Sequence, residues 1–339
     1  MSVTITDVAQ AAGVSFATVD RALNGRSGVH ARTRGRVMAA AQRIGYLTAE
    51  PAAAPAAAPA RLAFVVPGGT NTFLTLLSDG LAAAAIPGIT VTVHRLDTYR
   101  PDALAADLRR VAAEADGIGV VALDHPAVRE AIRDIAAAGT RVATLVSDII
   151  DVPRAFYVGI DNRAAGRLAG HLLGRFVKAS GTVALFAGSL CYRGHEEREM
   201  GFRRLCAEDF PSLALLPTQE MADDVSQSYA AARNVLAAHR DLVGIYCLGG
   251  GTRGIARALE ENGCAGRIAF VGHELTEHTR RFLVSGLLDA VIDQDAPAVA
   301  RAAVAQLAAV VRGAAPAVRL HRIQAIFREN LPDTTGGSR

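Results

Sequence analysis

The chain has 339 residues, 50% of them hydrophobic, with 36 Lys and Arg against 33 Asp and Glu, and four cysteines. This length suits two or three domains, and the hydrophobic fraction excludes a mostly disordered chain. No apolar stretch approaches the ~18 residues that a membrane span needs, and residues 1–4 do not begin a secretion signal. The cysteines form no CxxC pair, so we expect a cytoplasmic protein with no disulfide framework, metal or cofactor.

The net charge of +3 is distributed unevenly along the chain. Residues 1–49 contain six arginines and two aspartates, a charge of +4, so the other 290 residues together carry −1. A small basic segment joined to a near-neutral one is typical of proteins that bind nucleic acids.

Residues 50–60 form a run of alanine interrupted by Pro51, Pro55 and Pro59. Each interior proline removes an amide donor and costs a helix about 3 kcal/mol, so the run predicts an extended, semi-rigid linker. The predicted domains are therefore a head at residues 1–49, a Pro/Ala linker at 50–60 and a body at 61–339.

The head is predicted to form three short helices. Thr4 and Asp7 have the spacing of a capping box, and Asn24 with Gly25 can end the second helix. The expected limits are Thr4 to Gly13, residues 16–23 with Ser15 as N-cap, and residues 32–44 before Gly45. Two helices joined by a tight turn containing glycine, the second with a small polar outer face, predict a helix-turn-helix.

The outward face of the second helix suits the major groove of DNA. Arg21 can donate two hydrogen bonds to guanine, and Phe16 or Ala17 can contact a thymine methyl group. Four more side chains are placed to hold phosphates: Ser15, Thr18, Asn24 and Arg34. From the helical pattern alone, a three-helix bundle with a solvated basic face is the alternative.

The order of residues in the head closely resembles the LacI (lactose repressor) family of bacterial transcription factors. The residues that carry the resemblance are Thr-Ile-Thr-Asp-Val-Ala-Gln-Ala-Ala-Gly-Val-Ser at 4–15, Thr18-Val19, Arg21, Leu23-Asn24-Gly25, Thr33-Arg34, Val37 and Gly45-Tyr46. The resemblance implies a dimer that reads a palindromic DNA operator and is controlled by a small molecule, usually a sugar.

The head departs from the family at three places. Asp20 stands where the family usually has Ser, and a carboxylate there either repels phosphates or accepts from cytosine N4. His30 replaces the usual Ser or Thr cap of the third helix. The Pro/Ala linker stands where the family has a hinge helix that orders on DNA and inserts a Leu, and no Leu lies between Leu47 and Leu62.

The body alternates predicted strands and helices. Residues 62–66 form a continuous apolar run, as in a strand buried on both faces. Further strands are expected at residues 89–93, 118–123, 142–146, 183–186, 243–248, 268–271 and 290–292. Helices are expected at residues 73–85, 102–115, 126–138, 163–178, 195–208, 225–239, 252–262, 276–286 and 296–312. This alternation predicts a parallel α/β architecture, divided near residues 159–161 into two lobes with a ligand cleft between them.

The body resembles the periplasmic-binding-protein-like domain of the same family. Its landmarks are Tyr157 to Asn162 with Gly166, Gly188-Ser189, Arg198 with Gly201-Phe202, and Asp293-Gln294. The resemblance implies that six residues bind the effector: Asn71, Phe73, Asp148, Arg198, Gln294 and Glu274, the last where an Asp is usual. Such amides, charges and an aromatic ring suit a sugar or polyol. Alternatively, Asp148 or Asn162 caps a helix, or Arg198 pairs with Glu196 or Glu199 on the surface.

Three enzyme-like patterns compete with this interpretation. Residues 249–254 match GxGxxG after a predicted strand, and Glu274 lies 20 residues after the last glycine. This is the spacing of a dinucleotide-binding fingerprint. The run comes late in the α/β series, however, and a lone GxGxxG often forms only a tight turn. His273-Glu274-Leu-Thr-Glu277 misses HExxH at its last residue, and Cys191, His195 and Cys206 match no standard zinc spacing.

These observations predict a DNA-binding transcription regulator, a repressor in preference to an activator, and not an enzyme. The resemblance implies a palindromic double-stranded operator, a sugar or polyol effector, and a homodimer or a tetramer, with no membrane partner. The alternative is a nucleotide-binding protein or enzyme of the NAD type that carries a DNA-binding head.

Overall fold

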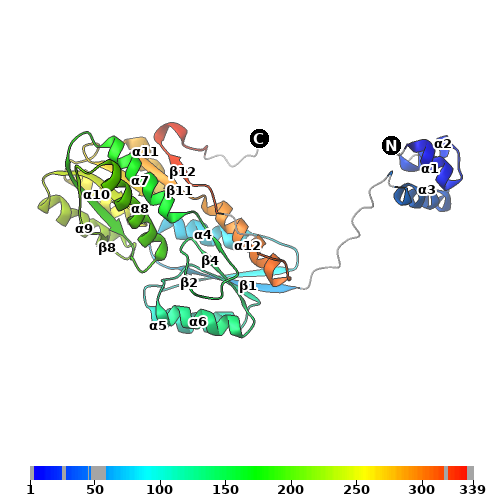
Figure 1. Ribbon diagram of the computed structural model, residues 1–339, viewed down its shortest axis with the longest axis horizontal. Helices are drawn as coiled ribbons and strands as arrows, with labels where there is room; N and C mark the ends of the chain where they lie inside the picture. The colour runs from blue at the N-terminus through cyan, green and yellow to red at the C-terminus, as the bar shows by residue number, and fades with distance from the viewer. Residues whose placement is uncertain (1–3, 25–27, 45, 47–58, 317–319, 334–339) are drawn as a thin grey trace. The chain divides into compact units, whose positions relative to one another are not determined.

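The computed structural model describes residues 4–24, 28–44, 46, 59–316 and 320–333 (Figure 1). The chain divides into two compact units, Met1–Ala57 and Ala58–Arg339. Except for its last two residues, the predicted Pro/Ala linker lies outside the described residues, as do Gly25 and Gly45.

The first unit contains the three predicted helices, α1 (Ile5–Ala12), α2 (Phe16–Leu23) and α3 (Ala31–Arg43). Thr4 and Asp7 form the expected capping box, and Gly13 ends α1 in the left-handed conformation at φ 62°. Ser15 caps α2 by accepting from the Thr18 backbone N–H. Val8, Val19 and Val37, one from each helix, are fully buried, so the three helices share one small core.

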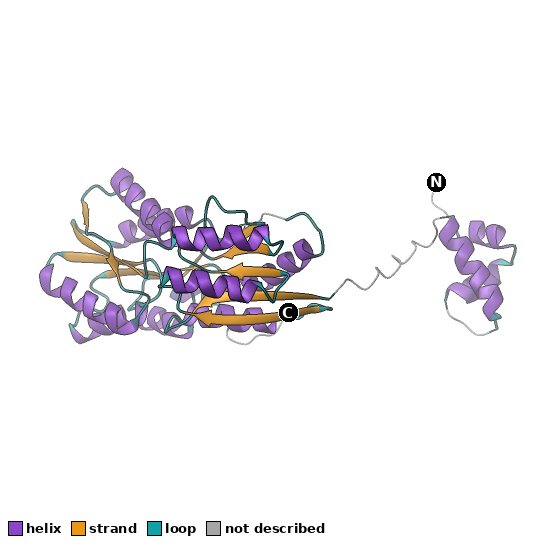
Figure 2. Cartoon of the chain, turned by 90° about the horizontal axis from the view of Figure 1, so that it is seen from below, coloured by secondary structure: helices purple, strands orange, loops and turns teal. Residues whose placement is uncertain are grey.

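The first lobe of the second unit is a parallel sheet covered on both faces by helices (Figure 2). Its strands are β1 (Ala60–Pro67), β2 (Ile89–Leu96), β3 (Gly117–Val120), β4 (Arg141–Leu145) and β5 (Phe156–Val158), in the order β2-β1-β3-β4-β5. One face packs against α4 (Thr72–Ala83) and α12 (Ala296–Val311). The other packs against α5 (Pro101–Ala112) and α6 (Pro126–Ala137).

The second lobe is a larger sheet of the same kind. Its strands are β6 (Gly181–Ala187), β7 (Leu213–Leu215), β8 (Gln219–Glu220), β9 (Leu242–Cys247), β10 (Ala269–His273), β11 (Ala290–Asp293) and β12 (Gln324–Ile326). The order is β12-β11-β10-β9-β6-β7, with β8 also paired to β6 and β12 antiparallel. One face packs against α7 (Asn162–Phe176) and α8 (Arg193–Asp209), the other against α9 (Val225–Ala238), α10 (Thr252–Glu261) and α11 (Glu277–Ser285). A 3-10 turn, η1 (Arg328–Asn330), follows β12.

The chain passes between the lobes three times: from β5 to α7, from β11 to α12, and from α12 to β12. The first crossing lies at residues 159–161, where the sequence predicts the division into lobes. The His321 backbone N–H donates to the Gly159 backbone oxygen at 2.8 Å, which ties the third crossing to the first. The two-lobed parallel α/β architecture is thereby confirmed.

Candidate functional site

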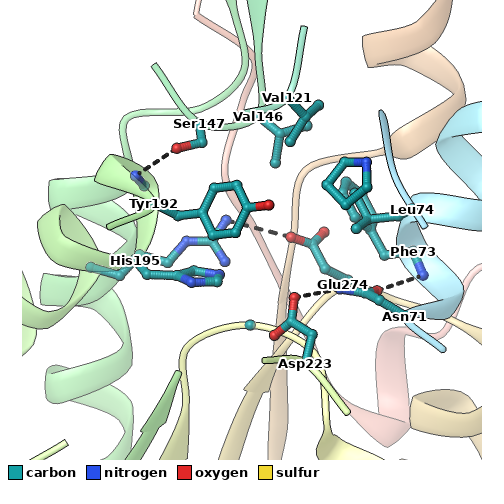
Figure 3. Close-up of a pocket in the computed structure, with 14 residues that line it drawn as sticks. Asn71, Phe73, Leu74, Val121, Val146, Ser147, Tyr192, His195, Asp223 and Glu274 are labelled. Carbon is teal, nitrogen blue, oxygen red and sulfur yellow. Dashed lines mark hydrogen bonds and ion pairs between the residues drawn. The ribbon is translucent and has the colours of Figure 1, made fainter. Parts of the chain in front are cut away.

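A cavity lies between the two lobes, at the C-terminal ends of the parallel strands (Figure 3). It encloses about 480 Å³ of space between protein atoms, including its open mouth. The first lobe contributes Pro67, Asn71, Phe73, Leu74, Val121, Val146 and Ser147, and the second contributes Tyr192, Gly194, His195, Arg198, Asp223, Gly249 and Glu274. All the charged side chains of this lining therefore belong to the second lobe.

The position of Arg198 follows from the close packing of α8 on α7. A Cβ atom on Gly166 of α7 would lie 2.0 Å from the backbone oxygen of Arg198. A Cβ atom on Gly201 of α8 would lie 2.1 Å from the backbone oxygen of Arg163. No side chain fits at either glycine, because two heavy atoms cannot approach so closely. The two glycines thereby bring Arg198 against Asn162 at the start of α7.

The side chain of Arg198 is 3% exposed, and its guanidinium donates to three segments of the second lobe. Its Nε donates to Asn162 Oδ1 at 2.8 Å, and its Nη1 donates to the Leu248 backbone oxygen at 2.6 Å. Its Nη2 donates to Glu274 Oε1 at 3.4 Å, and the fully buried Gln294 donates to the same oxygen at 2.7 Å. Three of the five N–H donors of Arg198 thus serve the wall of the cavity.

The carboxyl of Glu274 is buried and points into the cavity (Figure 3). Burial raises the pKa of Glu274 to about 7, and the neighbouring Arg198 offsets only part of that effect. Its Oε2 is buried and accepts no hydrogen bond from the described residues. Since a buried acceptor without a donor is costly, a hydroxyl of a bound molecule would be stabilised at this atom.

Asp223 joins the two lobes across the cavity. Its Oδ2 accepts from Asn71 Nδ2 at 3.0 Å, and its backbone oxygen accepts from the Thr70 hydroxyl at 3.3 Å. Its Oδ1 accepts from the Gly250 backbone N–H at 2.8 Å, within the second lobe. Other contacts between the lobes are Asp124 N to Cys191 O (2.8 Å), Gly194 N to Ser147 Oγ (3.1 Å) and the Thr98 and Tyr192 hydroxyls. The lobes are therefore closed around the cavity.

The structure brings four of the six predicted effector-binding residues together: Asn71, Phe73, Arg198 and Glu274 line the cavity. Gln294 lies behind Glu274 and does not reach the lining. Asp148 is also outside the lining, because Arg154 binds both of its carboxylate oxygens at 2.5 Å.

Both alternative interpretations of these side chains are wrong for the structure. Arg198 makes no surface ion pair, and Glu199 is instead bound by Arg203 at 2.7 Å. Asp148 caps no helix, and Asn162 is the first residue of α7, whose N-cap is Asp161.

Several lining residues are absent from the sequence prediction. Ser147 and Asp223 follow β4 and β8, and Tyr192 and His195 lie at the start of α8. His195 entered only as a candidate zinc ligand, yet its Nδ1 lies 3.0 Å from the Ser189 backbone oxygen and its ring faces the cavity (Figure 3). Burial lowers the pKa of His195, so the ring is neutral at pH 7. Within the described residues, no group of three His, Cys, Asp or Glu could hold a metal ion.

The glycines of the GxGxxG run have packing roles. A Cβ on Gly250 would lie 2.8 Å from Asn71 Nδ2 of the other lobe, and one on Gly254 would lie 2.2 Å from the Val225 backbone oxygen in α9. Gly251 has φ 87° and begins α10. The run therefore lets the loop after β9 approach the first lobe and lets α10 pack on α9, so these glycines have structural roles without a dinucleotide.

The predicted DNA-contacting residues lie on α2 and its flanks, with Arg34 in the first turn of α3. Most of them are exposed, namely Ser15, Phe16, Ala17, Arg21 and Asn24, and Phe16 is 56% exposed. The Ser15 and Thr18 hydroxyls lie 2.8 Å apart, and Asn24 Nδ2 donates to Asp20 Oδ1 at 2.8 Å. Asp20 therefore orients Asn24. His30 begins α3 without a side-chain capping bond, which agrees with its departure from the usual Ser or Thr.

A helix-turn-helix head followed by a two-lobed ligand-binding domain defines a class of bacterial transcription regulators. Residues 4–49 match the model of the bacterial regulatory proteins of the lacI family, and residues 62–315 match that of the periplasmic binding protein domain. The chain belongs to the periplasmic binding protein domain family through its second unit, and its first unit matches the DNA-binding domain of the lacI family. Among the described residues, no helix is long and apolar enough to cross a membrane.

Individual relatives agree with this assignment. The ribose operon repressor of Bacillus subtilis (strain 168) is 45% identical over 78 residues, which cover 23% of this chain and 24% of that protein. The match thus spans about a quarter of the relative's length. The glucose-galactose binding protein GanP of Geobacillus stearothermophilus has a TM-score of 0.73 and 25% identity over 80% of this chain and 99% of that one. A solute binding protein of Burkholderia graminis, in complex with D-arabinose, has a TM-score of 0.76 and 21% identity over 84% and 99%.

Proposed function

We propose that the protein is a transcriptional repressor whose affinity for a palindromic operator is controlled by a sugar or polyol bound between its lobes. It acts in the cytoplasm. It binds as a homodimer, because a palindrome presents the same half-site twice. The observation that carries the proposal is the unpartnered Glu274 Oε2 in a cavity that both lobes close. A ligand that binds one arrangement of the lobes better shifts the population of that arrangement.

The cavity chemistry supports a polyhydroxylated ligand. Asp223 and Glu274 supply acceptors for hydroxyl groups, and Asn71 supplies both an acceptor and a donor. Phe73 offers an apolar ring to a C–H face. The names of the relatives, a ribose operon repressor and a glucose-galactose binding protein, agree with this ligand class. Asp148 has no place in the proposed site, and Gln294 acts by holding Glu274.

On DNA, Arg21, Phe16 and Ala17 read bases in the major groove. Ser15, Thr18, Asn24 and Arg34 hold phosphates, and Asp20 acts by orienting Asn24. Arg21→Ala should therefore cost about 1–3 kcal/mol on the specific site and relax one base position. Arg34→Ala should weaken binding to all DNA sequences alike. It should also lower the slope of log affinity against log salt concentration by about 1, as expected for the loss of one phosphate contact. A binding-site selection that returns the same operator for wild type and Arg21→Ala contradicts the assignment.

The ligand is tested by measuring operator affinity of the full chain in the presence of sugars, polyols and nicotinamide nucleotides. Genomic binding sites, mapped first, supply the operator, and the genes beside it narrow the panel. A sugar or polyol that changes operator affinity supports the proposal. A change produced by NAD(H) alone would favour the nucleotide-binding alternative. Sedimentation of the chain with a two-half-site duplex distinguishes a dimer from a tetramer.

A further inference from the structure

The cleft between the lobes has a second compartment beside the first. It measures about 410 Å³, and it shares Asn71, Phe73, Gly249 and Glu274 with the cavity described above. Its other walls are the rest of the glycine turn at residues 249–251, the start of α10, and the segment that enters α11. Asp223, whose hydrogen bonds join the two lobes, lines the first compartment and not this one.

The start of α10 faces this second compartment. The helix has ten residues, and its N-cap is Gly251, which has no side chain to cap the first turn. The first N–H groups of a helix have no partner within it, and the helix dipole makes this end attractive to anions. Thr252 and Arg253, the first two residues of α10, both line the compartment.

An unpartnered buried side chain gives independent evidence for a ligand. His273 lines the compartment, is 2% exposed, and has its Nε2 at 2.8 Å from the Tyr246 hydroxyl. Its Nδ1 is buried and has no partner among the described residues. Burial lowers the pKa of His273 well below 6.5, so the ring is neutral. In the tautomer in which the Tyr246 hydroxyl donates to Nε2, the proton is on Nδ1, which is then a donor available to a bound group.

The Arg253 guanidinium adds positive potential to the compartment, and the His278 ring lies in the same lining. Arg253 and His278 both line it, from α10 and α11. Burial lowers the pKa of His278, and the charge of Arg253 lowers it further, with Glu277 opposing and Arg281 adding to the effect. On the shared wall, Glu274 Oε1 is bound by Arg198 and Gln294, and Oε2 is the atom assigned above to a ligand hydroxyl.

We propose that this second compartment binds an anionic group of the effector, a phosphate or a carboxylate, while the first compartment holds its hydroxyl groups. The inference rests on the proposed function, because it specifies the ligand of the same cleft. The backbone N–H groups of α10 and the His273 ring donate to the anion, and the positive charge of Arg253 offsets its charge. The effector is then a sugar phosphate or a sugar acid, not a neutral sugar.

The proposal is tested with defined anions on the full chain. Inorganic phosphate is titrated at constant ionic strength, against chloride, while the ring resonances of His278 and His273 are followed by NMR. We expect both rings to shift in wild type and the shift to weaken at least tenfold in apparent affinity in Arg253→Gln. The matched control is Arg257→Gln, one turn further along α10, where the arginine is bound to Glu261 and lies outside the lining.

A second arm uses pairs of aldoses with their phosphates and their uronic acids. The phosphate or the acid should bind at least tenfold more tightly than the parent sugar in wild type and in Arg257→Gln, but not in Arg253→Gln. The preferred member of each pair identifies which anion the site takes. If a neutral sugar alters operator affinity while anions leave His278 unmoved, this proposal is wrong and the repressor function stands. If no compound of either kind alters operator affinity, the proposed function itself fails.

Discussion

Replacing Arg198 with methionine should destabilise the second unit by about 3–5 kcal/mol. The side chain is 3% exposed, and methionine fills similar space without its donors. The variant leaves the Leu248 backbone oxygen and Asn162 Oδ1 without the N–H groups that now reach them. It also leaves Glu274 buried beside no cation, and removing one partner of a buried ion pair typically costs this much.

The loss should grow with pH. Burial holds the pKa of Glu274 at about 7 even beside Arg198, and without the arginine it rises further. Between pH 7 and the higher pKa of the variant, Glu274 of the folded variant keeps a proton that the unfolded chain has lost, so folding must take up a proton. Each pH unit in that range costs up to about 1.4 kcal/mol. The destabilisation by Arg198→Met is therefore larger at pH 8.5 than at pH 6.5.

The measurement is thermal unfolding of the full chain by calorimetry, followed through the transition of the second unit. A loss of this size lowers the melting temperature by about 6 °C or more, at about 2–4 °C per kcal/mol for large domains. The double variant Arg198→Met, Glu274→Gln should recover part of the loss and remove its pH dependence, because no buried carboxyl remains.

The matched control is Arg204→Met on the same helix. Arg204 binds Glu208 at 2.5 Å, but its side chain is 69% exposed, so its removal should cost no more than about 1 kcal/mol. The reasoning is refuted if Arg198→Met costs no more than Arg204→Met. It is also refuted if the loss is the same at both pH values and is unaffected by Glu274→Gln.

Three further predictions concern single substitutions, each measured by urea unfolding. Gly166→Ala should cost about 1–3 kcal/mol or more, because its Cβ would lie 2.0 Å from a backbone oxygen of α8; a cost below 0.5 kcal/mol would contradict that packing. Gly35→Ala, in the middle of α3 with no atom near the new Cβ, should instead stabilise the head by about 0.5–1 kcal/mol, and a loss of stability would oppose it. Glu274→Gln should remove a pH dependence: the folded pKa of about 7 exceeds the usual 4.5, so the contribution of Glu274 falls as pH rises from 4.5 to 7, by up to about 3 kcal/mol. A difference between wild type and this variant that stays constant from pH 4.5 to 8.5 would rule this out.

Local signals in the sequence were sufficient to predict the head. The hydrogen bonds that cap its helices join residues at most four positions apart in the sequence, as between Thr4 and Asp7 and between Ser15 and Thr18. The larger strands of the body were predicted for a similar reason, since most are continuous apolar runs, as β1 is, and β2 alternates apolar and polar residues. The strands β5, β7, β8 and β12 were missed, because two or three residues leave too short a pattern.

The cavity could be predicted only in part, because its residues meet through the tertiary fold. Arg198 reaches Glu274 across 76 positions, and Asn71 reaches Asp223 across 152. Asp148 shows the opposite failure: a carboxylate at the expected place was bound by Arg154, only six positions away. Chemical type and position after a strand therefore identify candidates, but competition from neighbouring side chains decides which of them face the cavity.

The backbone beside the cavity is strained at three residues that are not glycine. Val146, Asp223 and Glu274 all have positive φ, at 63°, 52° and 69°, although none is glycine. Such conformations cost about 1–3 kcal/mol each and persist only where surrounding contacts hold them. The contacts are present: the Val146 backbone oxygen accepts from the side chains of Tyr157 and Asn162, and the Glu274 backbone N–H donates to Ile292. The loops after β4, β8 and β10 thus aim one residue each into the cavity at a cost to stability, as expected of a site selected for binding.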